Sequence, residues 1–295
     1  MIEKQGALTA IVNVYLRDPL ENSPDENSLE LRPYDTAGGQ VYLGWDIKGS
    51  DVYLNTLGYS GALISGAPNA GKTVLVKRIA AELALSDVAV SIANGKNDSK
   101  FDVFKNAGIS VIGDDKPIFL EQLRERERLR QERMRSLPGD YQDQPVDSQP
   151  PLEVLIVDEF QEYLSAVTRD ERPVVEEITA LLTRLIKLQR SAGMFTILAT
   201  QKVDSQAIPT ALRDVIPSKI SGYTTTPEMT RMALGNLRDD EPHPDDKHVV
   251  PPGKPGRMII AGQAVIARLF QVANINDEQI IGAIRGGVSV SGSRQ

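Results

Sequence analysis

A glycine-rich stretch in the first third of the chain has the residue types and the spacing of a phosphate-binding loop. Residues 66–73 read GAPNAGKT, which matches the pattern G-x-x-x-x-G-K-[ST]. An apolar run precedes the stretch and an amphipathic helical pattern follows it, as a loop of this kind requires. Glycine lets backbone N–H groups approach the phosphates closely, and the helix N-terminus adds a favourable dipole. We therefore predict a nucleoside triphosphate site formed by Gly66, Ala67, Pro68, Asn69, Ala70, Gly71, Lys72, Thr73 and Val74.

Four polar side chains supply the chemistry that such a loop needs. The Lys72 ammonium would lie against the phosphates, and the Thr73 hydroxyl would bind Mg²⁺. Asp158 and Glu159 follow the apolar run LEVLIV, at the carboxyl end of a buried strand, where α/β sheets bind ligands. We predict that Asp158 helps to hold Mg²⁺ and that Glu159 positions or activates a water for hydrolysis. The alternatives are a ligand-free glycine turn and two acids that merely end a strand.

Two further polar residues flank the apolar run MFTILAT (194–200). Gln201 follows the run, and Arg190 closes the helical pattern before it. If this run is a strand beside the Asp158 strand, Gln201 lies near the γ-phosphate and can report its presence by hydrogen bonding. Arg190 then lies at the opposite end of the strand, far from its own nucleotide but free to reach that of a neighbouring subunit. On spacing alone, an arginine that offsets the dipole of its own helix is an equal alternative.

Continuous apolar runs alternate with helical patterns along the middle of the chain. Apolar runs without polar alternation are typical of strands buried on both faces of a parallel sheet. They cover residues 61–66, 88–93, 153–159 and 194–200, and the main helical stretches are 72–85 and 173–190. This order predicts an α/β fold with a mainly parallel central sheet flanked by helices.

The patterns divide the chain into three parts. Residues 1–58 form a β-rich segment, with a strand over 7–16 and a hairpin over 40–57 around the turn KGSD. Residues 59–272 contain the motifs and form the nucleotide-binding domain. Residues 273–295 are expected to form a short helix and a disordered tail, because the last ten residues are rich in glycine and serine.

The composition restricts the setting and the partners. The chain has no cysteine, which excludes disulfides and thiolate metal sites and favours a reducing interior, so we expect a cytoplasmic protein. No run approaches the roughly eighteen apolar residues needed to cross a bilayer, so we expect no membrane segment. The net charge of −7 disfavours nucleic-acid binding over the whole surface, but permits a narrow basic lining inside an acidic assembly.

A strongly charged helix is predicted over residues 119–136. It carries six arginines, and four of them follow a glutamate at i,i+3 spacing: Glu121–Arg124, Glu125–Arg128, Glu127–Arg130 and Glu132–Arg135. Because the two charges are interleaved, we expect a solvated or subunit-facing surface rather than a DNA-binding one.

The chain resembles the motor domain of the FtsK/SpoIIIE–HerA superfamily. The resemblance covers residues 38–270 and rests on four segments: VYLGWDIKGSDVYLNTLGYSGALISGAPNAGKT, LEVLIVDEF, LLTRLIKLQRSAGMFTILATQK and AIPTALRDVIPSKISGYTTTPEMTRMALG. The third is the most specific, because a helix, RSAG, a strand and ATQ in that order are the family's signature. The resemblance implies a RecA-like P-loop NTPase fold of the ASCE class, with ATP and Mg²⁺ as ligands. It also implies that Arg190 acts in trans and that Gln201 senses the γ-phosphate.

The same resemblance implies the assembly and the cargo. Family members form hexameric rings that move double-stranded DNA through a central pore by hydrolysing ATP. Lys202, Arg213 and Lys219 follow the sensor segment and are the candidate contacts to DNA phosphates, which would be salt-dependent and blind to sequence. No membrane-anchor segment and no C-terminal winged-helix pattern are recognised among these residues, so we expect a recruiting partner.

Two other functions remain open from the sequence. Relatives in secretion systems move polypeptide with the same fold, and the acidic net charge gives that reading some weight. A nucleotide-dependent assembly protein that hydrolyses slowly is the third reading. It is disfavoured because a scaffold does not need the full set of Lys72, Thr73, Asp158, Glu159, Arg190 and Gln201.

Overall fold

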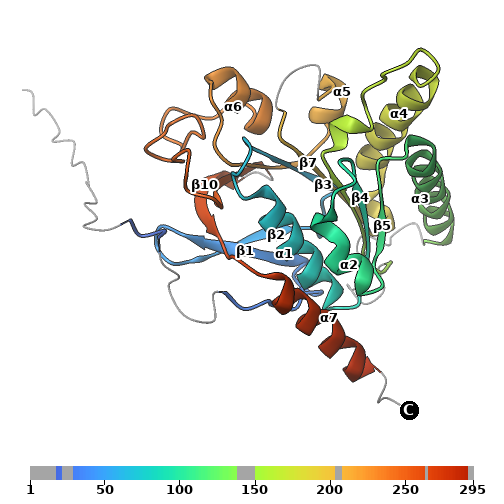
Figure 1. The fold of residues 1–295 in the computed structure, drawn as a ribbon, viewed down its shortest axis with the longest axis horizontal. Coiled ribbons are helices and arrows are strands. Elements are labelled where there is room, and N and C mark those ends of the chain that lie inside the picture. Colours follow the sequence, from blue (N-terminus) through green and yellow to red (C-terminus); the bar gives the residue numbers. More distant parts are fainter. Residues whose placement is uncertain (1–17, 22–28, 138–149, 203–207, 263–264, 292–295) are drawn as a thin grey trace, which may run out of the picture.

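A mixed β-sheet runs through the part of the chain that the computed structural model describes, residues 18–21, 29–137, 150–202, 208–262 and 265–291 (Figure 1). Its strands are β1 (Gln40–Asp46), β2 (Asp51–Asn55), β3 (Gly61–Ser65), β4 (Ala89–Asn94), β5 (Ser110–Ile112), β6 (Glu153–Asp158), β7 (Met194–Thr200), β8 (Ser218–Ser221), β9 (Arg257–Gly262) and β10 (Val265–Val272). The helices are α1 (Lys72–Ala84), α2 (Asp102–Asn106), α3 (Lys116–Ser136), α4 (Arg172–Leu188), α5 (Thr210–Arg213), α6 (Pro227–Leu234) and α7 (Asp277–Ser291).

The strand order is β2-β1-β10-β9-β8-β3-β7-β6-β4-β5. The six strands from β8 to β5 are parallel, and the pairs from β8 back to β2 are antiparallel. Strand β7 lies between the strand that leads into the phosphate loop and the strand that ends at Asp158. The predicted α/β fold with a mainly parallel sheet is confirmed.

The predicted hairpin forms, but it is joined to the sheet of the nucleotide-binding domain. Strands β1 and β2 pair across the turn after Asp46, and β1 also pairs with β10, where Gly44 lies opposite Val272. The N-terminal segment expected to precede this domain therefore extends its antiparallel edge. Strands β8, β9 and β10 were not predicted, although β9 (RMIIAG) is an apolar run that is buried along most of its length.

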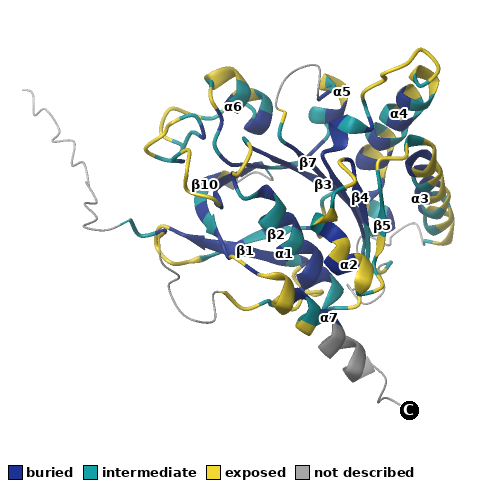
Figure 2. Ribbon diagram, in the orientation of Figure 1, coloured by how far each residue is buried: buried dark blue, intermediate teal, exposed yellow. Residues whose placement is uncertain are grey.

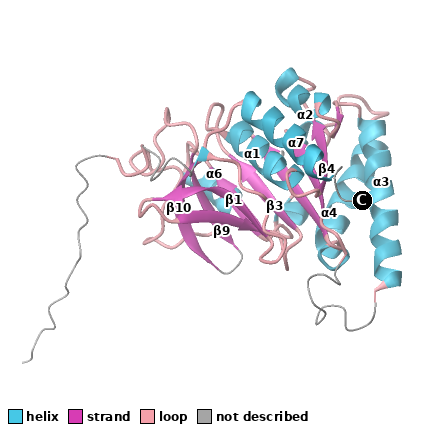
Figure 3. Ribbon diagram, turned by 90° about the horizontal axis from the view of Figure 1, so that it is seen from below, coloured by secondary structure: helices cyan, strands magenta, loops and turns pink. Residues whose placement is uncertain are grey.

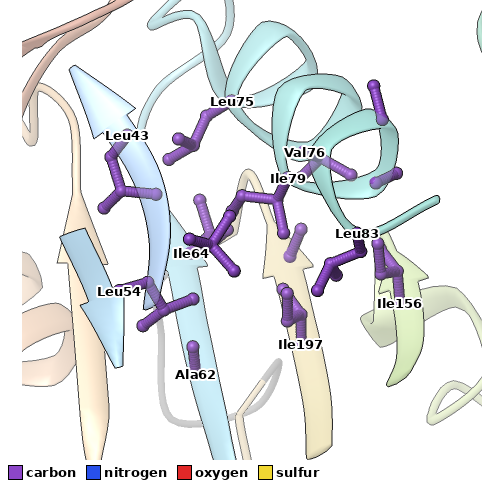
Figure 4. Close-up of a cluster of buried hydrophobic side chains, with 14 of the residues drawn as sticks. Leu43, Leu54, Ala62, Ile64, Leu75, Val76, Ile79, Leu83, Ile156 and Ile197 are labelled. Atoms are coloured by element: carbon purple, nitrogen blue, oxygen red, sulfur yellow. The ribbon is translucent and has the colours of Figure 1, made fainter. Parts of the chain in front are cut away.

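Helices cover both faces of the sheet (Figure 3). Helices α1, α2 and α7 pack on one face, whereas α3, α4, α5 and α6 contribute to a second core on the other. Figure 4 shows Leu75, Val76, Ile79 and Leu83 of α1 directed at the strands. All four are buried, and each contributes about 1.5–3 kcal/mol relative to an exposed side chain. This packing holds the helix that begins in the phosphate loop rigidly against the sheet.

Helix α3 has two different faces. Three of the predicted pairs form, at Glu121–Arg124, Glu125–Arg128 and Glu127–Arg130; among the described residues no ion pair joins Glu132 to Arg135. The outward face is exposed, as Figure 2 shows, but Arg126, Glu127 and Arg130 are buried. The expectation of a solvated or subunit-facing surface is therefore wrong for the inner face, where the charges are buried and paired within this chain.

Two expectations concern the ends of the chain. The strand expected over residues 7–16 lies outside the described residues. Helix α7 extends to Ser291, so part of the tail that was expected to be disordered is helical, while residues 292–295 lie outside the described part. None of the described helices is long and apolar enough to span a membrane.

Candidate nucleotide site

The phosphate loop connects β3 to α1 and is packed from behind by two other segments. The Ala67 N–H donates to the Tyr223 carbonyl (3.0 Å), and the Gly256 N–H donates to the Ala70 carbonyl (2.9 Å). Gly71 has φ +92°, and a Cβ there would lie 2.4 Å from the Gly256 nitrogen, so glycine is required on two grounds. The loop is thus preformed. No acidic residue lies in the first turn of α1 to oppose an anion at its N-terminus.

Lys72 is the cation of this loop and is almost fully buried. Its Nζ donates to the Gly66 carbonyl at 3.0 Å. Burial lowers the pKa of Lys72 to about 8, an effect that Glu159 and Asp158 oppose and Lys96 and Lys100 reinforce. A lysine held in this way gains most from a ligand of opposite charge, because the ligand replaces the lost hydration of the ammonium.

Asp158 and Glu159 lie at the carboxyl end of β6, on the sheet edge that carries the phosphate loop. Asp158 is 2 % exposed and Glu159 is 1 % exposed. Burial and the neighbouring Glu159 raise the pKa of Asp158 to about 6, while Lys100 and Lys72 oppose the rise. Glu159 has left-handed backbone angles (φ 49°, ψ 49°), which cost a non-glycine residue about 1 kcal/mol or more. Such strain is common where a side chain has to be aimed at a reacting group.

Three donors hold the Glu159 carboxylate. Lys96 Nζ lies 3.1 Å from Oε1, whereas Gln161 Nε2 and the Gln201 backbone N–H donate to Oε2 at 2.7 and 3.1 Å. The candidate water-activating group and the candidate sensor are therefore directly connected. Gly95 packs closely against the backbone of Glu159, since a Cβ on Gly95 would lie 2.6 Å from the Glu159 carbonyl oxygen.

Lys96 and Gln161 belong to the site but were missed by the reasoning from sequence. Lys96 follows β4, which pairs in parallel with β6, and Asn94 lies opposite Asp158 in that ladder. The carboxyl ends of adjacent parallel strands share one sheet edge. The polar residues after the run 88–93 therefore carried a usable signal. Gln161 carried none, because its approach to Glu159 depends on the turn at Phe160–Glu162.

The residues around Asp158 fit a hydrated divalent cation. Among the described residues, no group donates a hydrogen bond to the Asp158 side chain. The side-chain oxygens of Asn94 and Gln161 are buried and also lack a partner there. Carboxylate, hydroxyl and water oxygens are the ligands that Mg²⁺ prefers. Thr73 and Asp158 are thus suited to hold Mg²⁺, which when bound would neutralise charge on the phosphates.

Arg190 lies at the amino-terminal end of β7, opposite the carboxyl ends of the strands where the phosphate loop and Asp158 lie. It begins the short turn Arg190–Ala192, directly before β7, whereas Gln201 directly follows the same strand. Seven residues of extended strand span roughly 20 Å, so Arg190 is remote from its own phosphate loop. Its side chain is exposed and has no hydrogen-bond or ion-pair partner among the described residues. It lines a cavity of about 730 Å³ with Tyr59, Asp87 and Pro150.

The three candidate DNA contacts do not form one cluster. Lys202 is exposed at the carboxyl end of β7. Arg213 and Lys219 instead line a cavity of about 400 Å³ between α5, α6 and β8, together with Arg231 and Glu228. Burial, together with the nearby Arg213, lowers the pKa of Lys219. The structure therefore separates Lys202 from the other two.

The fold and the site define a P-loop ATPase. The sequence pattern of the ATPase family associated with various cellular activities (AAA) matches residues 62–221, which is more than half of the 295 residues, and the chain belongs to this family. The resemblance to the FtsK/SpoIIIE–HerA superfamily is confirmed by similarity to a DNA translocase FtsK.

The similar proteins are named for different processes. A DNA translocase FtsK of Listeria monocytogenes is 27 % identical over 233 residues, which covers 72 % of this chain but only 29 % of that protein. The pCW3 conjugation coupling protein TcpA, solved with ATPγS, has a TM-score of 0.73 at 16 % identity, covering 89 % of this chain and 74 % of that chain. The cytoplasmic domain of the type VII secretion ATPase EccC of Thermomonospora curvata has a TM-score of 0.61 at 19 % identity. The match covers 92 % of this chain and 33 % of that chain. At these identities, the two solved structures show the fold alone.

Proposed function

We propose that this chain is the motor of a homo-oligomeric ring, a hexamer, that hydrolyses ATP to translocate double-stranded DNA. The proposal of a ring rests on the distribution of the candidate residues between the two ends of the strands. Lys72, Asp158, Glu159 and Gln201 gather at the carboxyl edge, whereas Arg190 is exposed at the other. An arginine presented in this way can complete the site of a neighbour but not its own.

Each residue has a defined part in the proposed reaction. Lys72 binds the phosphates, and Thr73 and Asp158 hold the metal. Glu159 orients the attacking water, and its three donors fix the direction in which the carboxylate points. The Gln201 backbone N–H donates to the Glu159 carboxylate, so a movement of Gln201 would also move the carboxylate that orients the water. The neighbour's Arg190 stabilises the charge that develops during transfer.

The cargo proposal rests on the relative that moves DNA, and one further cargo has support. FtsK is named as a DNA translocase, and Lys202, Arg213 and Lys219 offer cations for backbone phosphates. Polypeptide is the second candidate, because the net charge is −7 and the fold is shared with a type VII secretion ATPase. The cysteine-free composition fits work in the cytoplasm, with a partner protein recruiting the motor.

The ATPase rate with and without linear duplex DNA, at 50 and 200 mM salt, tests the proposal. DNA translocation requires stimulation by DNA that falls as salt rises, because phosphate contacts release counterions. An ATPase rate that is the same with and without DNA at both salt concentrations would point to polypeptide cargo. Absence of turnover with Mg²⁺ and ATP under every condition would leave the slow assembly protein.

A further inference from the structure

The turn that carries Arg190 is fixed on the side of α4 by Gln189. This residue is fully buried. Its Nε2 donates to the Ser60 carbonyl at 2.6 Å and to the Thr196 hydroxyl at 2.9 Å, and its backbone N–H donates to the Leu185 carbonyl at 2.8 Å. The backbone that enters the turn is therefore tied to the end of α4, to the residue before β3 and to β7.

Arg133 of α3 fixes the other end of the same turn. Its Nη1 donates to the Ala192 carbonyl at 2.8 Å and to the Pro151 carbonyl at 3.0 Å, and its Nη2 lies 3.2 Å from Glu153 Oε2. A planar guanidinium can serve these three acceptors together, whereas a lysine ammonium has no such fork. Arg133 thus connects α3 to the start of β6 and to the last residue of the turn.

The other arginines of α3 have different partners. Arg126 shares Glu153 with Arg133 but does not hydrogen-bond to the turn, Arg130 pairs with Glu127, and Arg124 and Arg128 pair with glutamates on the exposed face. Within the described part of the chain, Arg133 is the arginine of α3 that hydrogen-bonds to the turn. The contact is therefore specific to one position of the helix.

The Arg190 side chain depends on this backbone support. It is exposed and has no partner among the described residues, so its direction is set by the backbone from which it projects. A misplacement of about 1 Å of a group that acts on a reacting centre can lower the rate about a hundredfold.

We propose that Arg133 is a positioning residue for Arg190: by holding the Ala192 carbonyl, it presents the Arg190 guanidinium to the nucleotide of a neighbouring copy of this chain. This inference rests on the proposed role of Arg190 in trans. Arg133 itself contacts the Pro151 and Ala192 carbonyls and Glu153, so it would act through the turn and not on the nucleotide directly.

Two substitutions in the full chain, Arg133→Gln and Arg133→Lys, test the inference by steady-state ATPase kinetics. We expect each to lower kcat about 10- to 100-fold and to leave KM for ATP within about twofold, because the chain's own phosphate loop is intact. The Lys variant keeps a charge opposite Glu153, so it separates loss of the fork from loss of folding. Arg128→Gln is the matched control, since its side chain is 60 % exposed on the same helix, and it should leave kcat within about twofold.

A double-mutant cycle supplies a readout that a general structural role would not give. If Arg133 acts only through Arg190, the double variant Arg133→Gln with Arg190→Ala should be no slower than Arg190→Ala alone. A double variant that is slower by the full factor of Arg133→Gln would overturn the inference, as would wild-type kcat in both Arg133 variants. If Arg190→Ala itself kept full activity, the proposed role in trans would fail instead.

Discussion

We predict that the buried position of Lys72 makes ATP affinity depend on pH in the range around pH 8. Burial lowers the pKa of this lysine to about 8 in the free protein. A triphosphate against the side chain favours the ammonium, so the bound protein keeps the proton to higher pH. Above pH 8, binding must take up a proton, and affinity therefore falls as the pH rises.

The size of the effect follows from the same value. With a pKa of about 8, Lys72 is about nine-tenths protonated at pH 7 and about one-tenth protonated at pH 9. The dissociation constant should therefore rise about tenfold over this range, or about 1.4 kcal/mol. Asp158, whose pKa burial raises to about 6, is already about nine-tenths ionised at pH 7, so its charge changes little over this range. Calorimetry with a non-hydrolysable ATP analogue, in buffers of two ionisation enthalpies and without Mg²⁺, measures both the affinity and the proton uptake.

Lys72→Arg provides the control for this experiment. A guanidinium keeps its charge across the whole range, so whatever affinity the variant retains should not change between pH 7 and pH 9. Wild-type affinity that stays constant over this range, with no proton uptake at pH 9, would refute the reasoning from burial.

Three further predictions concern single side chains. Lys72→Ala should abolish turnover in a coupled ATPase assay, because the phosphates lose their buried cation; measurable turnover would contradict the phosphate-loop assignment. Arg190→Ala should form rings that bind ATP but hydrolyse it about 10³-fold more slowly, as judged by sizing and kinetics; full activity would exclude action in trans. Glu82→Ala should lower the free energy of unfolding by about 3–5 kcal/mol in urea, because it removes the carboxylate that pairs with the buried Arg78, whereas the exposed Glu125→Ala should change it little. A loss below about 1 kcal/mol for Glu82→Ala would show that the pair is not stabilising.

The parts of the fold that could be predicted are those with a local signal. The runs that became β3, β4, β6 and β7 are continuous and apolar because both sheet faces are covered. The phosphate loop was readable because its glycines are required by the backbone at fixed spacing. Strand β8 (SKIS) had no comparable signal, whereas the apolar runs of β9 (RMIIAG) and β10 (VIARLFQV) were missed. The pairing of β1 with β10 had no local signal either, because Gly44 and Val272 are brought together from opposite ends of the chain.

The same distinction applies to the candidate site. The residues Lys72, Asp158 and Gln201 could be selected because each directly follows a strand or a loop with a recognisable pattern. Lys96 carried a usable signal, because it follows an apolar run that was expected to form a strand of the same sheet, but Gln161 could not be connected to Glu159 from spacing, since their contact depends on the turn after Glu159. Helix α3 was interpreted from its charges alone, and that interpretation missed the inner arginines.

By itself the sequence determined a nucleotide-binding α/β fold, with polar residues placed at the ends of particular strands, because backbone conformation and hydrophobic periodicity are local properties. Only the tertiary structure decided that Glu159 is shared by three donors and that Arg133 supports the turn of Arg190. Those contacts depend on the order of strands in the sheet and on which face of α3 packs inward. Both are set by burial across the whole chain, which no short segment can encode.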